Sequence, residues 1–448
     1  MKDSLTHRLP FPSRFLWGTA SAAHQVEGHN TNNDWWAFEQ QPGAIWHDDR
    51  SGSGCDWWRN AERDFDLMAD MGHNTHRLSV EWSRIEPEEG VFDATAIARY
   101  REMLTGLCQR NIEPMVTLHH FSTPLWLARQ GGWRNPDVVG HFRRYVCHVV
   151  EELGDLVTLW CTINEPNVYA FSGYVLGEHA PGEKSLVLYF RVLGNLLQAH
   201  GAAYRLIHSL DGSAQVGLVK NVQIFEPLDP GRRVSVHIAN LFDYLFNGIT
   251  LHAVDDGRLR FPLSLGFVTR GPLIDSLDFL GVNYYQRQRV SLSRANGGKL
   301  PLLQTTPGAE LSDFGQSGSY GEVYPMGMYR ALKRAASLGK PLYVTENGLP
   351  DADDDQRPRF LVTHLAQMQR AIAEGVDVRG YYHWSFTDNF EWAEGWGLRF
   401  GLVALDETTQ TRTPRPSARL YTDIIRANAI TPQMVKAYAP EVLADIFP

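Results

Sequence analysis

Two short runs, Thr162-Ile163-Asn164-Glu165-Pro166 and Tyr343-Val344-Thr345-Glu346-Asn347-Gly348, decide how this chain folds and what it can do. Each glutamate follows β-branched and aromatic residues, so each is predicted to be the last residue of a buried strand. Burying a carboxylate there costs on the order of several kcal/mol, which calls for a partner or a function. Two carboxylates across one pocket can cleave a glycosidic bond, because one donates a proton while the other attacks or activates water. The alternative is that each glutamate is only salt-bridged or caps a helix.

Eight runs of strand-forming residues alternate with amphipathic stretches along the chain. This repeated alternation predicts an α/β fold, a (β/α)8 TIM barrel with elaborated βα loops. No sequence repeat of fixed period is visible, which disfavours a solenoid or a propeller. The predicted strands are residues 15–20, 74–79, 115–119, 156–164, 215–219, 278–282, 342–345 and 380–384. The main predicted helices are residues 60–71, 96–110, 137–153, 186–210, 327–338 and 360–374.

One connection differs from the others. Residues 291–324, after the sixth predicted strand, are rich in Gly, Ser and Pro and show little periodicity. A loop of this length in a compact domain is usually functional or disordered. No linker divides the chain, so we expect residues 1–448 to form one catalytic barrel domain, a size that barrels reach with insertions.

Composition narrows the class of protein. The 448 residues are 43% hydrophobic, and the formal net charge of −9 argues against nucleic acid or an anionic membrane as a partner. No run reaches the roughly 18 apolar residues of a membrane span. Residues 1–15 hold charges and prolines where a signal peptide needs an apolar stretch. The four cysteines form no CxxC pair and no metal-finger spacing, so reduced thiols and a cytoplasmic location are expected.

Two clusters could suggest a metal, and neither is expected to bind one. The acidic residues from Asp351 to Asp355, interrupted only by Ala352, are expected to form a solvated loop. The adjacent residues His119 and His120 would point to opposite faces of a strand, which prevents them from sharing an ion. No metal and no organic cofactor is therefore predicted, since carboxylates and water suffice for the chemistry.

Polar and aromatic residues recur where the predicted strands end. In a parallel barrel the reactive groups gather at the carboxyl ends of the strands. Glu165 would lie at the end of strand four and Glu346 at the end of strand seven. One face of the barrel would collect acids, amides and aromatic rings from nearly every strand. The further residues of this face are Gln25, Arg77, His119, His120, Asn283, Tyr284, Tyr285 and Trp384.

Several motifs together resemble glycoside hydrolase family 1, the retaining β-glucosidases and β-glycosidases. The similarity extends from about residue 11 to about residue 425, and it is the combination of motifs that is specific. Besides the two glutamate runs, the matching segments are residues 15–20, 24–28, 77–84, 279–285, 389–395 and 399–402.

The resemblance implies a division of labour between the two glutamates. Glu165 would be the general acid/base, which needs a raised pKa, and Glu346 the nucleophile, which must stay ionised. Arg77 would supply the cation that holds Glu346 ionised, and Tyr285 would donate a hydrogen bond to the same carboxylate. For retention of configuration the two carboxyl groups should lie roughly 5–5.5 Å apart.

The resemblance also implies residues that bind the sugar. Asn164 would contact the 2-hydroxyl, and Trp384 would form the floor on which the ring stacks. His119 is instead expected to be a core or supporting histidine. The other expected substrate contacts are Gln25, His120, Asn283, Tyr285, Glu391 and Trp392.

The chain departs from the family pattern at three aromatic positions. Phe121, Asn167 and Gly321 stand where many members have tryptophan. These changes would thin the aromatic walls, so a wide and weakly selective leaving-group site is expected, tolerant of aryl groups, alkyl groups and a second glucose.

The expected activity is that of a retaining exo-β-glucosidase with β-galactosidase and β-fucosidase side activities and a role in cellulose degradation. Its partners would be small-molecule β-glycosides and short oligosaccharides, while the ranking of the sugars and the oligomeric state stay open. Three alternatives are disfavoured. Glu391 stands where 6-phospho-β-glycosidases typically have serine, and Glu165 where thioglucosidases have glutamine. A non-catalytic sugar-binding relative would usually lack one of the two carboxylates.

Overall fold

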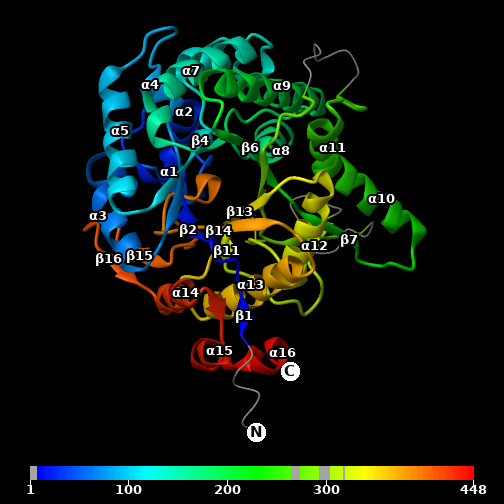
Figure 1. The fold of residues 1–448 in the computed structure, drawn as a ribbon. Coiled ribbons are helices and arrows are strands. Elements are labelled where there is room, and N and C mark those ends of the chain that lie inside the picture. Colours follow the sequence, from blue (N-terminus) through cyan, green and yellow to red (C-terminus); the bar gives the residue numbers. More distant parts are fainter. Residues whose placement is uncertain (1–7, 264–272, 292–302, 316–317) are drawn as a thin grey trace.

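The computed structural model describes residues 8–263, 273–291, 303–315 and 318–448. Eight parallel strands close into a barrel in which the first strand pairs with the last (Figure 1), which confirms the predicted fold class. The barrel strands are β2 (Leu16–Ala20), β3 (Thr75–Ser79), β4 (Glu113–His119), β5 (Leu159–Asn164), β6 (Gln215–Asn221), β8 (Phe279–Asn283), β13 (Leu342–Asn347) and β14 (Val378–His383).

Helices surround the barrel and alternate with its strands (Figure 1). Six of them match the predicted helices, namely α3 (Trp57–Asp70), α5 (Ala94–Gln109), α7 (Val138–Leu153), α9 (Leu186–Leu210), α12 (Pro325–Ala335) and α13 (Arg357–Ala373). The helices that were not predicted are α1 (Ala23–Val26), α2 (Asp34–Glu39), α4 (Trp82–Ile85), α6 (Leu125–Arg129), α8 (Pro166–Phe171), α10 (Arg233–Asp243), α11 (Ile249–Asp256), α14 (Pro416–Ala427), α15 (Pro432–Tyr438) and α16 (Leu443–Ile446). None of the helices within the described ranges is long and apolar enough to cross a membrane.

The barrel strands are buried on both faces, as expected for a parallel sheet covered by helices. Every residue of β3, β5 and β13 is buried. The glutamate after β5 differs slightly from the prediction. Glu165 lies one residue beyond the strand in the left-handed region (φ 45°, ψ 60°) and directly precedes Pro166, the first residue of α8. Glu346 is the penultimate residue of β13.

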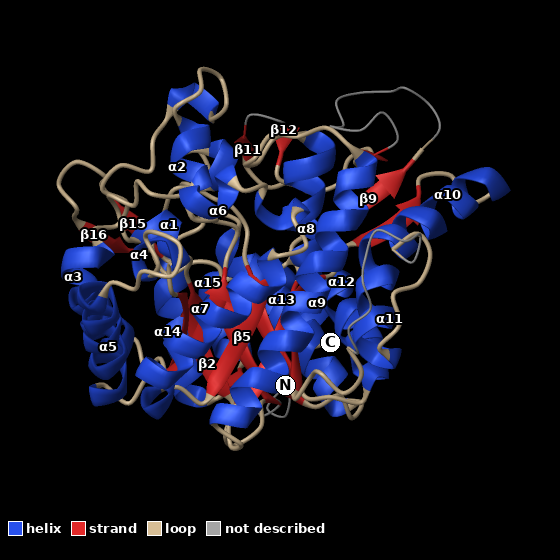
Figure 2. Cartoon of the chain, turned by 90° about the horizontal axis from the view of Figure 1, so that it is seen from above, coloured by secondary structure: helices blue, strands red, loops and turns tan. Residues whose placement is uncertain are grey.

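A small sheet outside the barrel accounts for part of the long predicted connection. In it β9 (Arg287–Val290) lies between β7 (Ile224–Pro227) and β10 (Leu303–Gln304). Residues 292–302 and 316–317 of the connection lie outside the described part of the chain. The other short strands are β1 (Leu9–Pro10), β11 (Phe314–Gly315), β12 (Gly318–Ser319), β15 (Val403–Leu405), β16 (Arg412–Pro414) and β17 (Ala429–Ile430). In Figure 2, β9, β11 and β12 lie on one side of the barrel strands β2 and β5.

The expectation of a solvated acidic loop is wrong for two of its residues. Asp351 and Asp354 are buried, whereas Asp353 and Asp355 are exposed. Asp351 accepts a hydrogen bond of 2.7 Å from the backbone N–H of Arg357, and Asp354 forms a buried ion pair with the Arg357 side chain. A cluster of like charges suggests solvent exposure, but here the compensating cation lies a few residues further along the chain.

The cysteines agree with the prediction, since all four are free.

A buried ion pair ties down the segment that follows β14. The Arg415 guanidinium makes two hydrogen bonds of 2.9 Å to the two carboxylate oxygens of Asp388. Asp388 also accepts from the backbone N–H of Gly401 at 2.9 Å. This bidentate pair fixes the base of the loop that carries Glu391 and Trp392.

Replacing Arg415 by Met should lower the free energy of unfolding by about 3–5 kcal/mol, because the Asp388 carboxylate would remain buried without its cation. Urea unfolding followed by circular dichroism measures the change. The matched control is Arg419→Met on the exposed side of α14, which should stay within about 0.5 kcal/mol of the unaltered protein. Equal stability of the two variants would contradict this role for the ion pair.

Candidate active site

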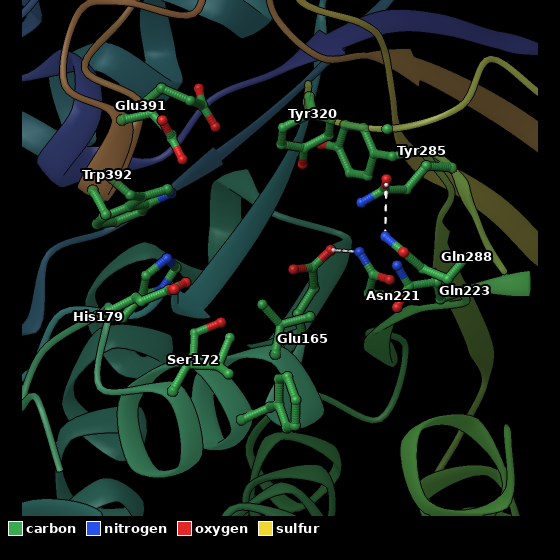
Figure 3. A pocket seen from close by; sticks show the side chains of 18 of the residues that line it. Glu165, Ser172, His179, Asn221, Gln223, Tyr285, Gln288, Tyr320, Glu391 and Trp392 are labelled. Atoms are coloured by element: carbon green, nitrogen blue, oxygen red, sulfur yellow. Dashed lines mark hydrogen bonds between the residues drawn. The ribbon is translucent and has the colours of Figure 1, made fainter. Parts of the chain in front are cut away.

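A cavity of about 520 Å³ opens at the carboxyl ends of the barrel strands. Residues at the ends of β4, β5, β6, β8, β13 and β14 line it. The sequence predicted that polar groups would gather at this end of the barrel. The residues from these strand ends are His120, Asn164, Glu165, Asn221, Tyr285, Glu346 and Trp384. Figure 3 shows Glu165 near the centre of the cavity, with Glu391 and Trp392 on one side and Asn221 on the other.

A buried cation holds Glu346. One oxygen of its carboxylate accepts a hydrogen bond of 2.5 Å from Nη1 of Arg77, and the other accepts from the Tyr285 hydroxyl at 2.6 Å. The Arg77 side chain is completely buried and also donates to Thr117 Oγ1 at 3.0 Å. A carboxylate between a guanidinium and a hydroxyl donor is stabilised in its charged form.

Among the described residues, the hydrogen-bond donors to Glu165 are neutral amides. Its Oε1 accepts hydrogen bonds from the side-chain amides of Asn283 at 2.7 Å and Asn221 at 2.9 Å. Burial is the main reason that the pKa of Glu165 rises to about 7, and the negative charge of Glu346 adds to the rise, while the two amides oppose it. The Glu165 carboxyl can therefore exchange a proton near neutral pH.

The two carboxylates belong to one network of hydrogen bonds. While Nη1 of Arg77 holds Glu346, its Nη2 donates to the Asn164 side-chain oxygen at 2.6 Å. Asn283 Nδ2 reaches the same Asn164 oxygen at 3.3 Å and also holds Glu165. One side of this network is cationic and the other neutral, an asymmetry that suits one carboxylate to attack and the other to donate a proton.

Most of the residues expected to bind sugar line the cavity. The His120 ring stacks against Trp384 and Trp392, with centroid separations of 6.0 Å to each. Its Nε2 lies 3.1 Å from the side-chain nitrogen of Asn164. Glu391 accepts from the indole N–H of Trp384 at 3.4 Å, and burial raises the pKa of Glu391 well above its usual value.

Two residues expected to contact the sugar, Asn283 and Gln25, are not among the described residues that line the cavity. The Asn283 amide is committed to Glu165, and its oxygen accepts from Thr345 Oγ1 at 2.7 Å, so this residue positions the carboxyl group. Gln25 is fully buried behind Glu391 and donates to Asn389 and to the Phe390 carbonyl, both at 2.8 Å. Gln25 Oε1 has no partner among the described residues.

Four further residues named in the sequence analysis differ in whether they line the cavity. As expected, His119 is a core residue; its Nε2 accepts a hydrogen bond of 3.0 Å from Trp133, and burial lowers its pKa to about 3. Phe121 lines the cavity and packs 5.2 Å from Trp392. Gly321 also lines it, whereas Asn167 is buried outside it and donates to the Asn221 carbonyl at 3.5 Å.

Sequence reasoning missed several residues of the site. Asn221, which holds Glu165, ends β6 two residues beyond the predicted strand, so extending that strand would have found it. Tyr320 lies in the long connection, and its ring packs 5.6 Å from Tyr285. Gln223, Gln286 and Gln288 also line the cavity. No local pattern distinguishes these four residues, because their positions depend on segments outside the barrel.

Comparison with known proteins gives consistent matches. Residues 7–430 match the sequence model of glycosyl hydrolase family 1. β-Glucosidase A of Thermotoga maritima is 31% identical over 448 residues, which span 94% of this chain and 98% of the relative. A β-galactosidase of Sulfolobus acidocaldarius is 32% identical over 493 residues, 95% of this chain and 97% of the relative. The solved structure of a β-glycosidase from Pyrococcus horikoshii has a TM-score of 0.86 and 41% identity, covering 96% of this chain and 98% of that one.

The surroundings of Glu165 predict a titration near neutral pH. Its carboxyl should be protonated below and ionised above a pKa of about 7. Replacing Glu346 by Gln should move this pKa down, because one of the two charges is removed, but not to the usual value, because burial is the larger cause. Carbon-13 NMR of labelled glutamate carboxyls measures the pKa of Glu165 in the unaltered protein and in the Glu346→Gln variant. The Glu165→Gln variant assigns the signal.

The control for this titration is Glu374→Gln, which removes a half-exposed carboxylate on the far end of α13. This variant should leave the Glu165 signal unchanged. A pKa of Glu165 near 4.5, or one that does not respond to Glu346→Gln, would contradict the electrostatic account.

Proposed function

The chain belongs to glycosyl hydrolase family 1, and from this premise we propose that it is a retaining exo-β-glucosidase that removes terminal β-D-glucosyl residues. The observation that carries the proposal is the contrast between two buried carboxylates on one cavity. Glu346 contacts the Arg77 guanidinium, whereas Glu165 accepts hydrogen bonds from the amides of Asn221 and Asn283 and has a pKa of about 7.

In the first proposed step, Glu346 attacks the anomeric carbon of the substrate. Glu165 protonates the glycosidic oxygen at the same time, the bond between this oxygen and the anomeric carbon breaks, and the leaving group departs as an alcohol. The product is a glycosyl ester on Glu346. In the second step, the ionised Glu165 takes a proton from water as the water oxygen attacks the anomeric carbon. The ester bond breaks, and both carboxyl groups return to their starting states.

The electrostatics of the site favour the change of Glu165 from proton donor in the first step to proton acceptor in the second. In the free site, the charge of Glu346 helps to raise the pKa of Glu165, so that Glu165 holds its proton. The glycosyl ester is neutral, so its formation removes that contribution and favours the ionised Glu165 that the second step needs. The freed Arg77 and Tyr285 donors remain in place to stabilise the Glu346 carboxylate as it leaves.

We propose that the sugar lies between Glu165 and the aromatic pair Trp384 and Trp392. Trp384 would stack on the ring, while Glu391 and His120 would bind hydroxyls. Asn164, which Arg77 orients, would bind the 2-hydroxyl. Gln25 would reach the sugar only through its unpartnered Oε1, and the Asn283 amide already holds Glu165.

A 6-phosphoglycosidase is disfavoured by the charge of the cavity. The described residues that line it include Glu165, Glu346 and Glu391 but neither lysine nor arginine. A phosphate in this cavity would therefore find no lysine or arginine among the described lining residues to neutralise its charge. Activity on galactosides and fucosides is proposed as a side activity, because the relatives include enzymes named for glucosides and for galactosides. A single catalytic domain, a cytoplasmic location and a role in cellulose degradation remain part of the proposal.

A panel of nitrophenyl β-glycosides tests this function. We expect the glucoside to give the highest kcat/KM, the galactoside and the fucoside to lie within about 100-fold of it, and the glucoside 6-phosphate to give no turnover. The Glu346→Ala variant should keep its melting temperature within a few degrees and lose at least about 10⁴-fold in kcat, because the nucleophile is removed.

The control for this loss is Glu394→Ala, which removes a carboxylate that lines the cavity but that we assign no chemical role. Its kcat on nitrophenyl glucoside should stay within about tenfold of the unaltered enzyme. Turnover of the 6-phosphate, or an active Glu346→Ala variant, would overturn the proposal.

A further inference from the structure

Three glutamines form a polar wall on one side of the cavity. Gln223, Gln286 and Gln288 all line it, and we call this set the amide wall. Figure 3 shows Gln223 and Gln288 beside Asn221, across the cavity from Glu391 and Trp392. Glu165 lies between the two groups. If Glu165 protonates the glycosidic bond and the sugar lies by Glu391, the leaving group must lie against the amide wall.

The alternation of β9 aims two of these amides at the cavity. Successive side chains of a strand point to opposite faces, so Gln288 of β9 and Gln286, which directly precedes β9, share one face, and Arg287 and Arg289 share the other. On that other face, Arg287 pairs with Glu322 at 2.7 Å, and Arg289 pairs with Glu226 at 2.9 Å. Ion pairs therefore hold the strand from behind, while the amides face the cavity.

A buried asparagine holds the backbone of the third glutamine, Gln223. The Asn247 side chain accepts a hydrogen bond from the backbone N–H of Gln223 at 3.2 Å and donates to its carbonyl at 2.7 Å. Asn247 is fully buried and donates to Asp243 at 2.9 Å. The backbone of Gln223 is thereby held in place next to Asn221, the residue that binds Glu165.

Gly321 makes room for the wall. A Cβ atom at this position would lie 1.5 Å from the side-chain oxygen of Gln286, so a tryptophan here would exclude that amide. Glycine in place of tryptophan at position 321 therefore does more than remove an aromatic ring. The Gln286 amide, which can form hydrogen bonds, occupies part of the space that the tryptophan would fill.

Most of the hydrogen-bonding capacity of the amide wall is unused within the described chain. One hydrogen bond links two members, from Gln288 Nε2 to Gln286 Oε1 at 3.2 Å. The described residues supply no other side-chain partner to these three amides. An alkyl or aryl leaving group would displace water from the amides without replacing its hydrogen bonds, which is unfavourable. A leaving group with several hydroxyls would replace them.

Apolar residues also line the cavity. Val168 and Phe171 come from α8, and Phe246 comes from the π-helical turn Tyr244–Gly248. A pyranose ring has apolar C–H faces and a polar rim, so such a cavity can bury a face and bind the hydroxyls of the rim.

We propose that the amide wall determines leaving-group specificity and selects a second sugar unit over alkyl and aryl groups. This inference rests on the proposed function, and it replaces the broad tolerance expected from the sequence alone. Gln223, Gln286 and Gln288 act as specificity residues that bind hydroxyls of the leaving sugar and take no part in the bond-breaking steps.

The test compares cellobiose, octyl β-glucoside and nitrophenyl β-glucoside as substrates for Gln223→Leu, Gln288→Leu and the double variant. Each single change should lower kcat/KM for cellobiose by about 3- to 10-fold, the effect of one lost hydrogen bond, and the double change should lower it by at least about 10-fold. The values for nitrophenyl and octyl glucosides should stay within about 3-fold, since the octyl chain offers the amides no hydrogen bond and the nitro group is only a weak acceptor. Gln109→Leu, an exposed change on α5, is the matched control and should leave all three substrates unaffected.

A double variant that keeps its activity on cellobiose would overturn the inference, and so would an equal loss on all three substrates, which would indicate general damage to the site. Failure of the proposed function is distinguishable, because the unaltered protein would then hydrolyse none of the three glucosides.

Discussion

The buried guanidinium of Arg77 is the interaction on which the site depends. It lies inside the barrel, where an unpaired charge would be very costly, and five hydrogen-bond donors in a rigid fork must find acceptors there. One arm holds Glu346, the other holds Asn164, and Nε holds Thr117. Because the two arms are rigidly joined, the positions of the carboxylate and the amide are set together. The difference between the two glutamates follows from this arrangement, since Arg77 neutralises only one of them.

Buried or partly buried ion pairs also occur in the segments that surround the cavity. Asp388 and Arg415 fix the loop after β14, Asp354 and Arg357 fix the loop after β13, and the arginines of β9 pair with acids behind the amide wall. Loops are the variable part of a barrel enzyme, and binding groups need a rigid support. The ion pairs supply that support from outside the cavity, so the inner faces of the loops remain available to the substrate.

The strands and the two glutamates could be predicted because their signals are local. A buried parallel strand is a short apolar run, and a carboxylate at its end is conspicuous in the sequence. The buried Asp351 and Asp354, the ring of Tyr320 and the amide wall could not be predicted in this way. The two aspartates are held by groups of the turn itself, chiefly Arg357, whose contacts only the folded turn reveals. The other residues depend on partners distant in sequence or on pairing outside the barrel, such as β9 with β7. Gln25 and Asn283 were correctly placed near the site, but the contacts of their side chains required coordinates.

The central claim is that Glu165 and Glu346 act as a pair in two successive displacements at one carbon. The most direct test is proton NMR of the first sugar released from nitrophenyl β-glucoside, recorded before mutarotation. Two inversions at the anomeric carbon restore its configuration, so β-glucose should appear first and α-glucose should grow in only slowly. Release of α-glucose as the first product would mean a single displacement by water, and it would contradict the roles assigned to both glutamates.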